Sequence, residues 1–147
     1  MHNTEAEEEI RSLFAQWWDE SAAMDIERTM ARIADDVVSY EHQTPLVHRG
    51  EPAVRASCQG GFDAMKQMGG EFRWTVGDLE VVARDDIAVA WGINHMRTTK
   101  DGETIHESRS RGTWLFRRQH GRWQAIHQHF SYPCDPATGQ AVMNLTA

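Results

Sequence analysis

Two histidines near the C-terminal end of the sequence are the side chains best suited to acid/base chemistry. His127 and His129 lie in the stretch Trp123 to Pro133, which has the residue pattern of a β-strand. Alternate side chains of a strand point to the same face, so the two imidazoles are predicted to lie side by side on the face of Trp123. Free histidine titrates near pH ~6.5, so the pair could transfer protons at neutral pH. A solvated strand face is the alternative interpretation of the same residues.

A carboxylate and a phenol are neighbours at the end of an earlier predicted strand. This strand covers 37–42 and puts Tyr40 and Glu41 on opposite faces, so both can face one pocket only where a bulge or the strand end breaks the alternation. A glutamate whose pKa is raised by its pocket can remove a proton from a carbon next to a carbonyl group. Glu41 is therefore a candidate base. An exposed glutamate or an ion-pair partner of Arg111 is the alternative.

The later strands carry further candidates. His95 shares a strand face with Trp91, and an aromatic ring beside an imidazole suits a flat substrate. Asn94 falls on the opposite face, so at most one of Asn94 and His95 can line a pocket. Arg111 could hold a carboxylate or enolate oxygen through two hydrogen bonds. Surface exposure is expected for the histidines near loops and strand ends, which are His42, His48 and His106.

A metal site is a second interpretation of the histidine pair. His127 and His129, two residues apart on one strand, can bind one ion, and Glu41 or His95 could add a third ligand. Nothing in the spacing demands a metal, so the main expectation is chemistry without a cofactor.

The composition is that of one ordinary globular domain covering 1–147. With 147 residues, of which 40% are hydrophobic and 25% charged, the chain can bury a hydrophobic core without disulfides. Its net charge of −7 argues against general nucleic-acid binding. Cys58 and Cys134 lack metal-binding spacing and are predicted to be free thiols in a reducing compartment. No signal peptide or membrane span is encoded, so we expect a cytoplasmic protein that does not bind membranes.

Helical periodicity is confined to the first half of the sequence. Thr4 and Glu7 have the spacing of a capping box, and the apolar residues that follow predict a helix over 5–23. Asp25 can cap a short second helix, and a third is predicted to end near Met68. From Phe72 onward the hydrophobic period changes to two, which predicts long strands joined by tight turns. Helices followed by an antiparallel meander indicate an α+β fold.

Several motifs in this order resemble the SnoaL-like branch of the nuclear transport factor 2-like (NTF2-like) superfamily, over nearly the whole chain. They are Ala34-Asp35-Asp36-Val37-Val38, Tyr40-Glu41, Thr44-Pro45-Leu46, Arg49-Gly50 and the ending Trp123-x3-His127-x-His129-x-Ser131-x-Pro133-x-Asp135-Pro136-x-Thr138-Gly139. The resemblance implies a cone-shaped, curved antiparallel sheet with three helices packed on its concave face. It also implies a ligand cavity inside the cone and, in many members, a homodimer.

The family includes isomerases, cyclases, dehydratases and non-catalytic members, so the fold does not select one function. Position by position, the resemblance to ketosteroid isomerase puts Glu41 in the place of the general base. A tryptophan, Trp17 or Trp18, stands in the region of the isomerase's tyrosine, which makes steroid isomerisation itself unexpected. The resemblance to the cyclases gives the acid/base work to histidine and aspartate on the long strands, where this sequence has His95, His127 and His129.

The resulting hypothesis is cofactor-independent acid/base catalysis on a small, flat molecule that carries a carbonyl group. Glu41 is the base, the histidine pair the acid/base partners and Arg111 the anion stabiliser. A module that binds a small ligand or dimerises without catalysis is the alternative, and a metal-dependent enzyme is a further one. The pocket is predicted to be lined by Trp17, Tyr40, Trp91, His95 and Trp123.

Overall fold

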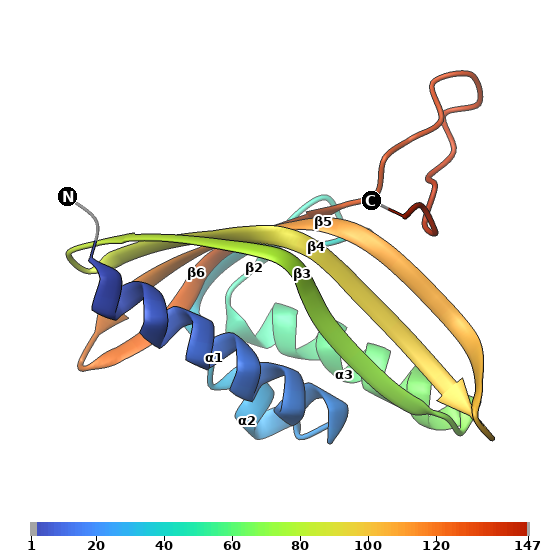
Figure 1. The fold of residues 1–147 in the computed structure, drawn as a ribbon, viewed down its shortest axis with the longest axis horizontal. Coiled ribbons are helices and arrows are strands. Elements are labelled where there is room, and N and C mark those ends of the chain that lie inside the picture. The colour runs from blue at the N-terminus through green and yellow to red at the C-terminus, as the bar shows by residue number, and fades with distance from the viewer. Residues whose placement is uncertain (1–2, 147) are drawn as a thin grey trace.

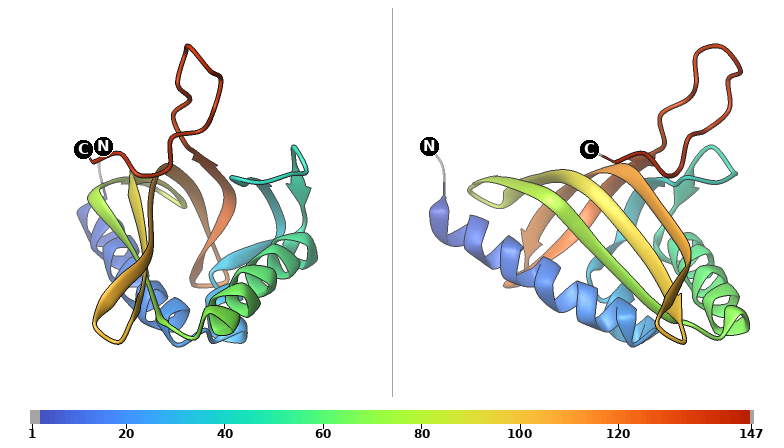
Figure 2. Two further views of the ribbon diagram at one scale, coloured as in Figure 1. Left: turned by 90° about the vertical axis from the view of Figure 1, so that its right-hand side faces the viewer. Right: turned by 45° about the vertical axis from the view of Figure 1, so that its right-hand side comes forward.

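The computed structural model describes residues 3–146 and has the predicted α+β architecture. Helices and strands follow one another as α1 (Thr4–Ala22), α2 (Ile26–Met30), β1 (Ile33–Tyr40), β2 (His48–Arg49), α3 (Glu51–Met68), β3 (Glu71–Arg84), β4 (Ile87–Lys100), β5 (Glu103–Gln119) and β6 (Arg122–Ser131). Figures 1 and 2 show the sheet curving over α1 and α3, which lie on its concave side. Within the described residues, no helix is long and apolar enough to cross a membrane.

The helices begin at side chains that satisfy free backbone N–H groups. The prediction that Thr4 caps the first helix is wrong, because Asn3 is the capping residue and its Oδ1 accepts a hydrogen bond from the Ala6 amide at 3.1 Å. Asp25 caps α2 as predicted, accepting from the Arg28 amide at 3.1 Å. α3 ends at Met68, where the sequence predicted its end.

The strands form one sheet in the order β2-β1-β6-β5-β4-β3. All neighbouring strands are antiparallel except β1 and β6, which pair in parallel with Val38 opposite His127 and Tyr40 opposite His129. β1 begins at Ile33, earlier than predicted, and its register to β6 shifts between Ile33 and Val38. This parallel pairing brings the end of β1 beside the C-terminal half of β6.

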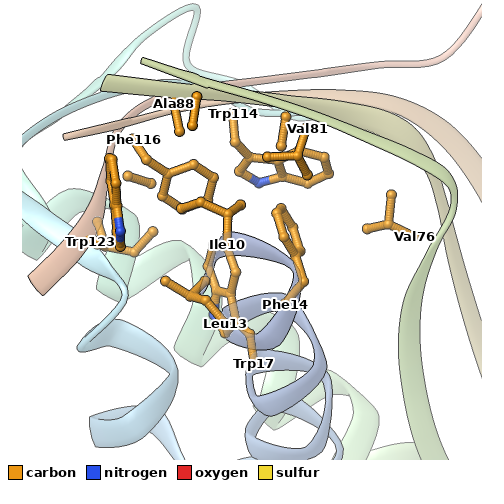
Figure 3. Close-up of a cluster of buried hydrophobic side chains, with 14 of the residues drawn as sticks. Ile10, Leu13, Phe14, Trp17, Val76, Val81, Ala88, Trp114, Phe116 and Trp123 are labelled. Carbon is orange, nitrogen blue, oxygen red and sulfur yellow. The ribbon is translucent and has the colours of Figure 1, made fainter. Parts of the chain in front are cut away.

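The core lies between α1 and the concave face of the sheet, and it is rich in aromatic rings. Phe14 on α1 is fully buried, with its ring centroid 5.0 Å from that of Trp114 and 5.7 Å from that of Phe116. Figure 3 shows these rings packed together beneath β5. α1 covers only one end of the concave face, and α3 lies over the other end.

Close packing of β4 against β3 makes a prediction at Gly92. A Cβ atom there would lie 2.5 Å from Val76 Cγ1 and 2.7 Å from the Gly77 carbonyl oxygen. We expect Gly92→Ala to lower the free energy of unfolding by about 1–3 kcal/mol, because backbone must move to relieve the overlap. Urea unfolding followed by circular dichroism measures the change.

Gly61 provides the matched control for this substitution. It lies inside α3, and a Cβ atom there would meet no atom of the described residues within 4 Å. Gly61→Ala should therefore stabilise the protein by about 0.5–1 kcal/mol, through helix propensity alone. A Gly92→Ala protein as stable as wild type would show that the two strands are less tightly packed than described.

Candidate active site between the sheet and α3

A cavity of about 890 Å³ lies between the concave face of the sheet and α3. Small residues of α3 face it, and a Cβ atom at Gly60 or Gly61 would point into open space. Only Val54 and Phe62 of this helix are buried, so α3 acts as a wall of the cavity more than as part of the core. The aromatic residues that line the cavity are Trp17, Phe62, Phe72, Trp74, Trp114 and Phe130.

Glu41, the residue directly after β1, lines this cavity. Val37 and Ser39 of β1 are fully buried, so Glu41 continues their face of the strand and points inward, while Tyr40 lies on the outer face, 39% exposed. The predicted place of Tyr40 in the pocket is therefore wrong. Gln128 Nε2 donates a hydrogen bond to Glu41 Oε1 over 3.5 Å. Burial raises the pKa of the Glu41 carboxyl above its ordinary value, and the neighbouring Ser39, His48 and Gln128 offset only part of that effect.

His42 also lines the cavity, contrary to the exposure predicted for it. Its ring is stacked between those of Phe130, at 5.4 Å, and Tyr132, at 4.6 Å. Burial lowers the pKa of His42 to about 4, so the imidazole is neutral at pH 7. No local signal pointed to this contact, because the loop after β1 has no periodicity and the stacking partners lie far along the chain.

A chain of buried and partly buried hydrogen bonds leads from Trp74, in the cavity wall, to His42. Trp74 Nε1 donates to Asn94 Oδ1 at 2.8 Å, and Asn94 Nδ2 donates to Ser110 Oγ at 3.2 Å. Ser110 Oγ in turn lies 2.7 Å from His42 Nε2. Of the two neighbouring candidates on β4, Asn94 is therefore the one that lines the cavity, and His95 points to the other face.

The prediction that His127 and His129 share a pocket with Glu41 is wrong in its placement. Both lie on the outer face of the sheet, and Gln128 and Phe130 take the inward positions. They do not share the face of Trp123 as predicted, because the register of β6 to β5 shifts between Ala125 and His127 and reverses the alternation. The ring of Tyr40 stands edge-on to both, 4.9 Å from His127 and 5.3 Å from His129. His127 Nδ1 donates to the Val38 carbonyl oxygen at 2.7 Å, which fixes that ring against β1.

Three more predicted site residues lie on the outer face. Trp91 is 42% exposed, and Arg111 is exposed opposite Ile93. His95 Nε2 lies 3.6 Å from a Glu107 carboxylate oxygen. Their predicted places in the pocket are corrected for the same reason as those of the histidine pair, since Asn94 and Ser110 occupy the inward positions of β4 and β5.

The other two tryptophans predicted to line the pocket differ in position. Trp17 lines the cavity, and its Nε1 donates to the Thr29 carbonyl oxygen at 3.1 Å. Trp123 lies instead at a second depression, between α1 and β6, where its Nε1 donates to Glu9 Oε2 at 2.6 Å. Its placement in the ligand pocket is therefore wrong.

The residues needed for the metal interpretation are not assembled. Within residues 3–146 the structure brings together no group of three or more His, Cys, Asp or Glu side chains that could hold an ion. Glu41 and His95 thus do not complete a site with the histidine pair. Cys58 and Cys134 are free thiols, as predicted, and burial raises the pKa of Cys58 to about 12, which keeps it protonated.

The raised pKa of Glu41 predicts how stability depends on pH. Because the folded protein holds this proton more tightly than the unfolded chain, stability falls as pH rises from the ordinary carboxyl value of 4.5 through the raised one. Glu41→Gln has no carboxyl group to ionise, so this variant does not lose stability in this way as the pH rises. We expect the variant to match wild type near pH 4 and to become the more stable protein toward pH 8.

Urea unfolding of both proteins between pH 4 and pH 8 tests this expectation. Glu103→Gln, in the exposed hairpin between β4 and β5, controls for the loss of one negative charge. A Glu41→Gln protein that is less stable than wild type at every pH would show that the carboxylate is held by contacts that favour its charge.

Comparisons with known proteins agree with this architecture. The sequence pattern of the SnoaL-like domain matches residues 10–135. A solved NTF2-like protein of unknown function from Pseudomonas putida is 31% identical over 100% of both chains, with a TM-score of 0.85. Among curated proteins, the search finds no match.

More distant solved structures share the fold. Aln2 from a Streptomyces species is 14% identical, with 88% of this chain and 91% of that chain covered and a TM-score of 0.78. A protein from Catenulispora acidiphila, solved in complex with S-DNPA, is 12% identical, with 88% and 94% covered and a TM-score of 0.72. The family pattern covers most of the chain, and we conclude that the protein belongs to the SnoaL-like domain family, with the NTF2-like fold.

Proposed function

We propose that the protein is an enzyme that catalyses cofactor-independent acid/base chemistry on a small, flat, carbonyl-bearing molecule held in the cavity. The reaction is of the isomerase, cyclase or dehydratase type. One observation carries the proposal, namely a carboxylate with a raised pKa, Glu41, at the wall of a cavity rich in aromatic side chains. A carboxylate in such surroundings is a stronger base than one in water and is a recurrent feature of active sites.

The cavity lining favours an uncharged substrate. Among the described lining residues there is no lysine or arginine, so a carboxylate or phosphate group would lack a permanent countercharge. The volume of about 890 Å³ lies in the range of small-molecule sites. Trp17, Trp74 and Trp114 offer wide ring surfaces, which suit a flat molecule.

Glu41 acts as the base in this proposal. It removes a proton from the carbon next to the bound carbonyl group, and the electron pair of that C–H bond moves into a carbon–carbon double bond as the carbonyl oxygen becomes an enolate oxygen. The protonated carboxyl then returns the proton to another atom of the substrate, which completes an isomerisation. Dehydration or ring closure would follow from the same enolate.

Solvent exchange tests this function even while the natural substrate is unidentified. 2-Indanone and 2-tetralone are flat, neutral ketones, and nuclear magnetic resonance in deuterium oxide follows the loss of their α-protons. We expect the wild-type protein to accelerate the exchange and Glu41→Gln to lose the acceleration. Binding of either ketone, seen as a change in tryptophan fluorescence, without any accelerated exchange would instead support a non-catalytic binding module. The related Catenulispora acidiphila protein was itself solved in complex with a ligand, S-DNPA.

The predicted homodimer remains a proposal, and the outer face of the sheet supports it. Trp91, Ile87 and Val82 are each at least 40% exposed there, on adjacent strands β3 and β4. Such a patch can pair with its own copy across a two-fold axis, so that each residue contributes twice.

Trp91→Arg should therefore weaken self-association, by about 2 kcal/mol or more because a buried tryptophan is a common anchor of interfaces. Sedimentation velocity over a range of concentrations measures the effect. Leu46→Arg, at a loop position that is 90% exposed, is the matched control and should leave association unchanged. A monomeric wild-type protein would refute the proposal.

A further inference from the structure

We propose that His42 is a second catalytic residue, whose neutral imidazole donates a hydrogen bond from Nδ1 to the substrate oxygen as negative charge develops on it. The proposal rests on the proposed function, because it assigns the partner of the Glu41 base. It also assigns Ser110, Asn94 and Trp74 as positioning residues that act through His42.

The hydrogen-bond chain determines which ring nitrogen carries the proton. Ser110 Oγ already accepts from Asn94 Nδ2, and among the described residues the only other hydrogen-bond partner of the Ser110 hydroxyl is His42. Ser110 is 2% exposed, so leaving that proton without a partner would be costly. The hydroxyl therefore donates to His42 Nε2, which makes Nε2 the acceptor and leaves the proton on Nδ1.

Trp74, at the other end of the hydrogen-bond chain, fixes the direction of its hydrogen bonds. Trp74 Nε1 can only donate, so Asn94 Oδ1 must be the acceptor at 2.8 Å and Asn94 Nδ2 must face Ser110. Each link thus has one possible sense, from Trp74 to His42. A fixed orientation of this kind holds an active-site group in place before the substrate arrives.

His42 Nδ1 is free to contact a ligand. It has no hydrogen-bond partner among the described residues, although His42 lines the cavity. The ring is held between Phe130 and Tyr132, and none of its hydrogen bonds within residues 3–146 goes to a carboxylate that would favour the charged form. Burial keeps the pKa of His42 at about 4, in agreement with a neutral donor.

Glu41 and His42 would then divide the reaction between them. The Glu41 carboxylate takes the α-proton and becomes neutral, while the electron pair released from the C–H bond ends on the carbonyl oxygen. His42 donates a hydrogen bond to that oxygen but does not give up its proton, so the imidazole leaves the reaction unchanged. The proton on Glu41 returns to the substrate, and no further reactant is needed. A neutral imidazole donor matches a weakly acidic enol better than a cation would.

Nitrogen-15 resonance spectra of the histidine rings test the assignment of the tautomer directly. At pH 7 we expect His42 to show the proton on Nδ1, and to stay neutral as the pH is lowered to 5. Ser110→Ala should abolish the preference for this tautomer. Ser108→Ala is the matched control, because Ser108 is a serine of the same strand, also 2% exposed, and has no hydrogen bond to His42. A proton on Nε2 in the wild-type protein would overturn the proposal.

Exchange of 2-indanone tests the catalytic role. His42→Ala should slow the exchange by about 10²- to 10³-fold, the usual effect of removing one donor to a developing oxyanion. Ser110→Ala should slow it less, and His106→Ala, at an exposed position of β5, should have no effect. Circular dichroism verifies that each variant is folded, and the tautomer spectra of Ser110→Ala stand even if His42→Ala does not fold.

The outcomes separate this proposal from the proposed function. If exchange depends on Glu41 but not on His42, then the base is correct and the assignment of His42 is wrong. If the wild-type protein does not accelerate exchange, then the proposed function fails, and with it the catalytic role of His42, whatever tautomer the spectra show.

Discussion

Phe14→Ala is expected to lower the free energy of unfolding by about 3–5 kcal/mol, the range of the most destabilising core substitutions. Phe14 is 0% exposed, and five aromatic rings have their centroids within 6.4 Å of its own. Trp114 and Phe116 stand edge-on to it, at 5.0 and 5.7 Å, and Trp17 lies at 5.7 Å along the same helix. Figure 3 shows that it fills the space between α1 and β5.

The expected loss of stability in Phe14→Ala is large because the side chains around Phe14 are rigid. Large indole rings cannot collapse into the space that the phenyl ring leaves, so both the lost contacts and the remaining cavity contribute. Small domains are stable by only about 5–15 kcal/mol, so the variant could lose much of its stability. The same loss would loosen the Trp17 and Trp114 side of the ligand cavity.

Urea unfolding at pH 7 measures this effect, with two comparisons. Phe14→Leu keeps most of the volume and should cost less than Phe14→Ala. Leu46→Ala removes a side chain that is 90% exposed and should change stability by no more than about 0.5 kcal/mol. Equal stabilities of Phe14→Ala and Leu46→Ala would mean that α1 does not hold the sheet as described.

The helices and strands were predictable because local chemistry determines them. Asp25 caps a helix and the apolar period of residues 10–17 forms one face, whatever the rest of the chain does. Strand periodicity likewise predicted β3 to β6. The parallel pairing of β1 with β6 could not be predicted in this way, because it joins segments about ninety residues apart, such as Val38 and His127.

Strand periodicity predicts which side chains share a face only where strand pairing is regular. The register of β6 to β5 shifts between Ala125 and His127, so the buried residues Trp123 and Ala125 do not share a face with the histidine pair. On β6, the outer face carries His127 and His129, whereas the inner face carries Gln128 and Phe130. Both faces are mixtures of polar and aromatic residues, so composition does not separate them. The inner polar residues of the neighbouring strands satisfy one another, as Asn94 and Ser110 do, and this pairing is not visible in the pattern of any single strand.

Glu41 could be placed from the sequence only through the resemblance to ketosteroid isomerase. The alternation of side chains along a strand would have allowed either Tyr40 or Glu41 to lie inside the cavity. In the structure Glu41 shares the inward face of the buried residues Val37 and Ser39, as the alternation requires. His42 departs from the alternation, because β1 stops at Tyr40, and no local pattern could have indicated its place inside.

Substitutions at Glu41 are expected to have the largest effect on activity. Glu41→Gln keeps the volume of the side chain and the hydrogen-bonding capacity, but removes the base, so exchange of 2-indanone should slow by about 10²- to 10⁴-fold. Glu41→Asp keeps the base but draws it back by one methylene group. A displacement of about 1 Å can cost ~10²-fold, so this variant should be active yet strongly impaired.

A substitution on the outer face of the sheet is the control for the Glu41 variants. His129→Ala removes an imidazole from the far side of the sheet, where the structure places no contact with the cavity, and should leave exchange at the wild-type rate. Because Glu41→Gln is expected to be more stable than wild type at neutral pH, loss of its activity could not be attributed to unfolding. If His129→Ala were the impaired variant and Glu41→Gln the active one, catalysis would have to take place on the outer face. The cavity between the sheet and α3 would then serve only to bind a ligand.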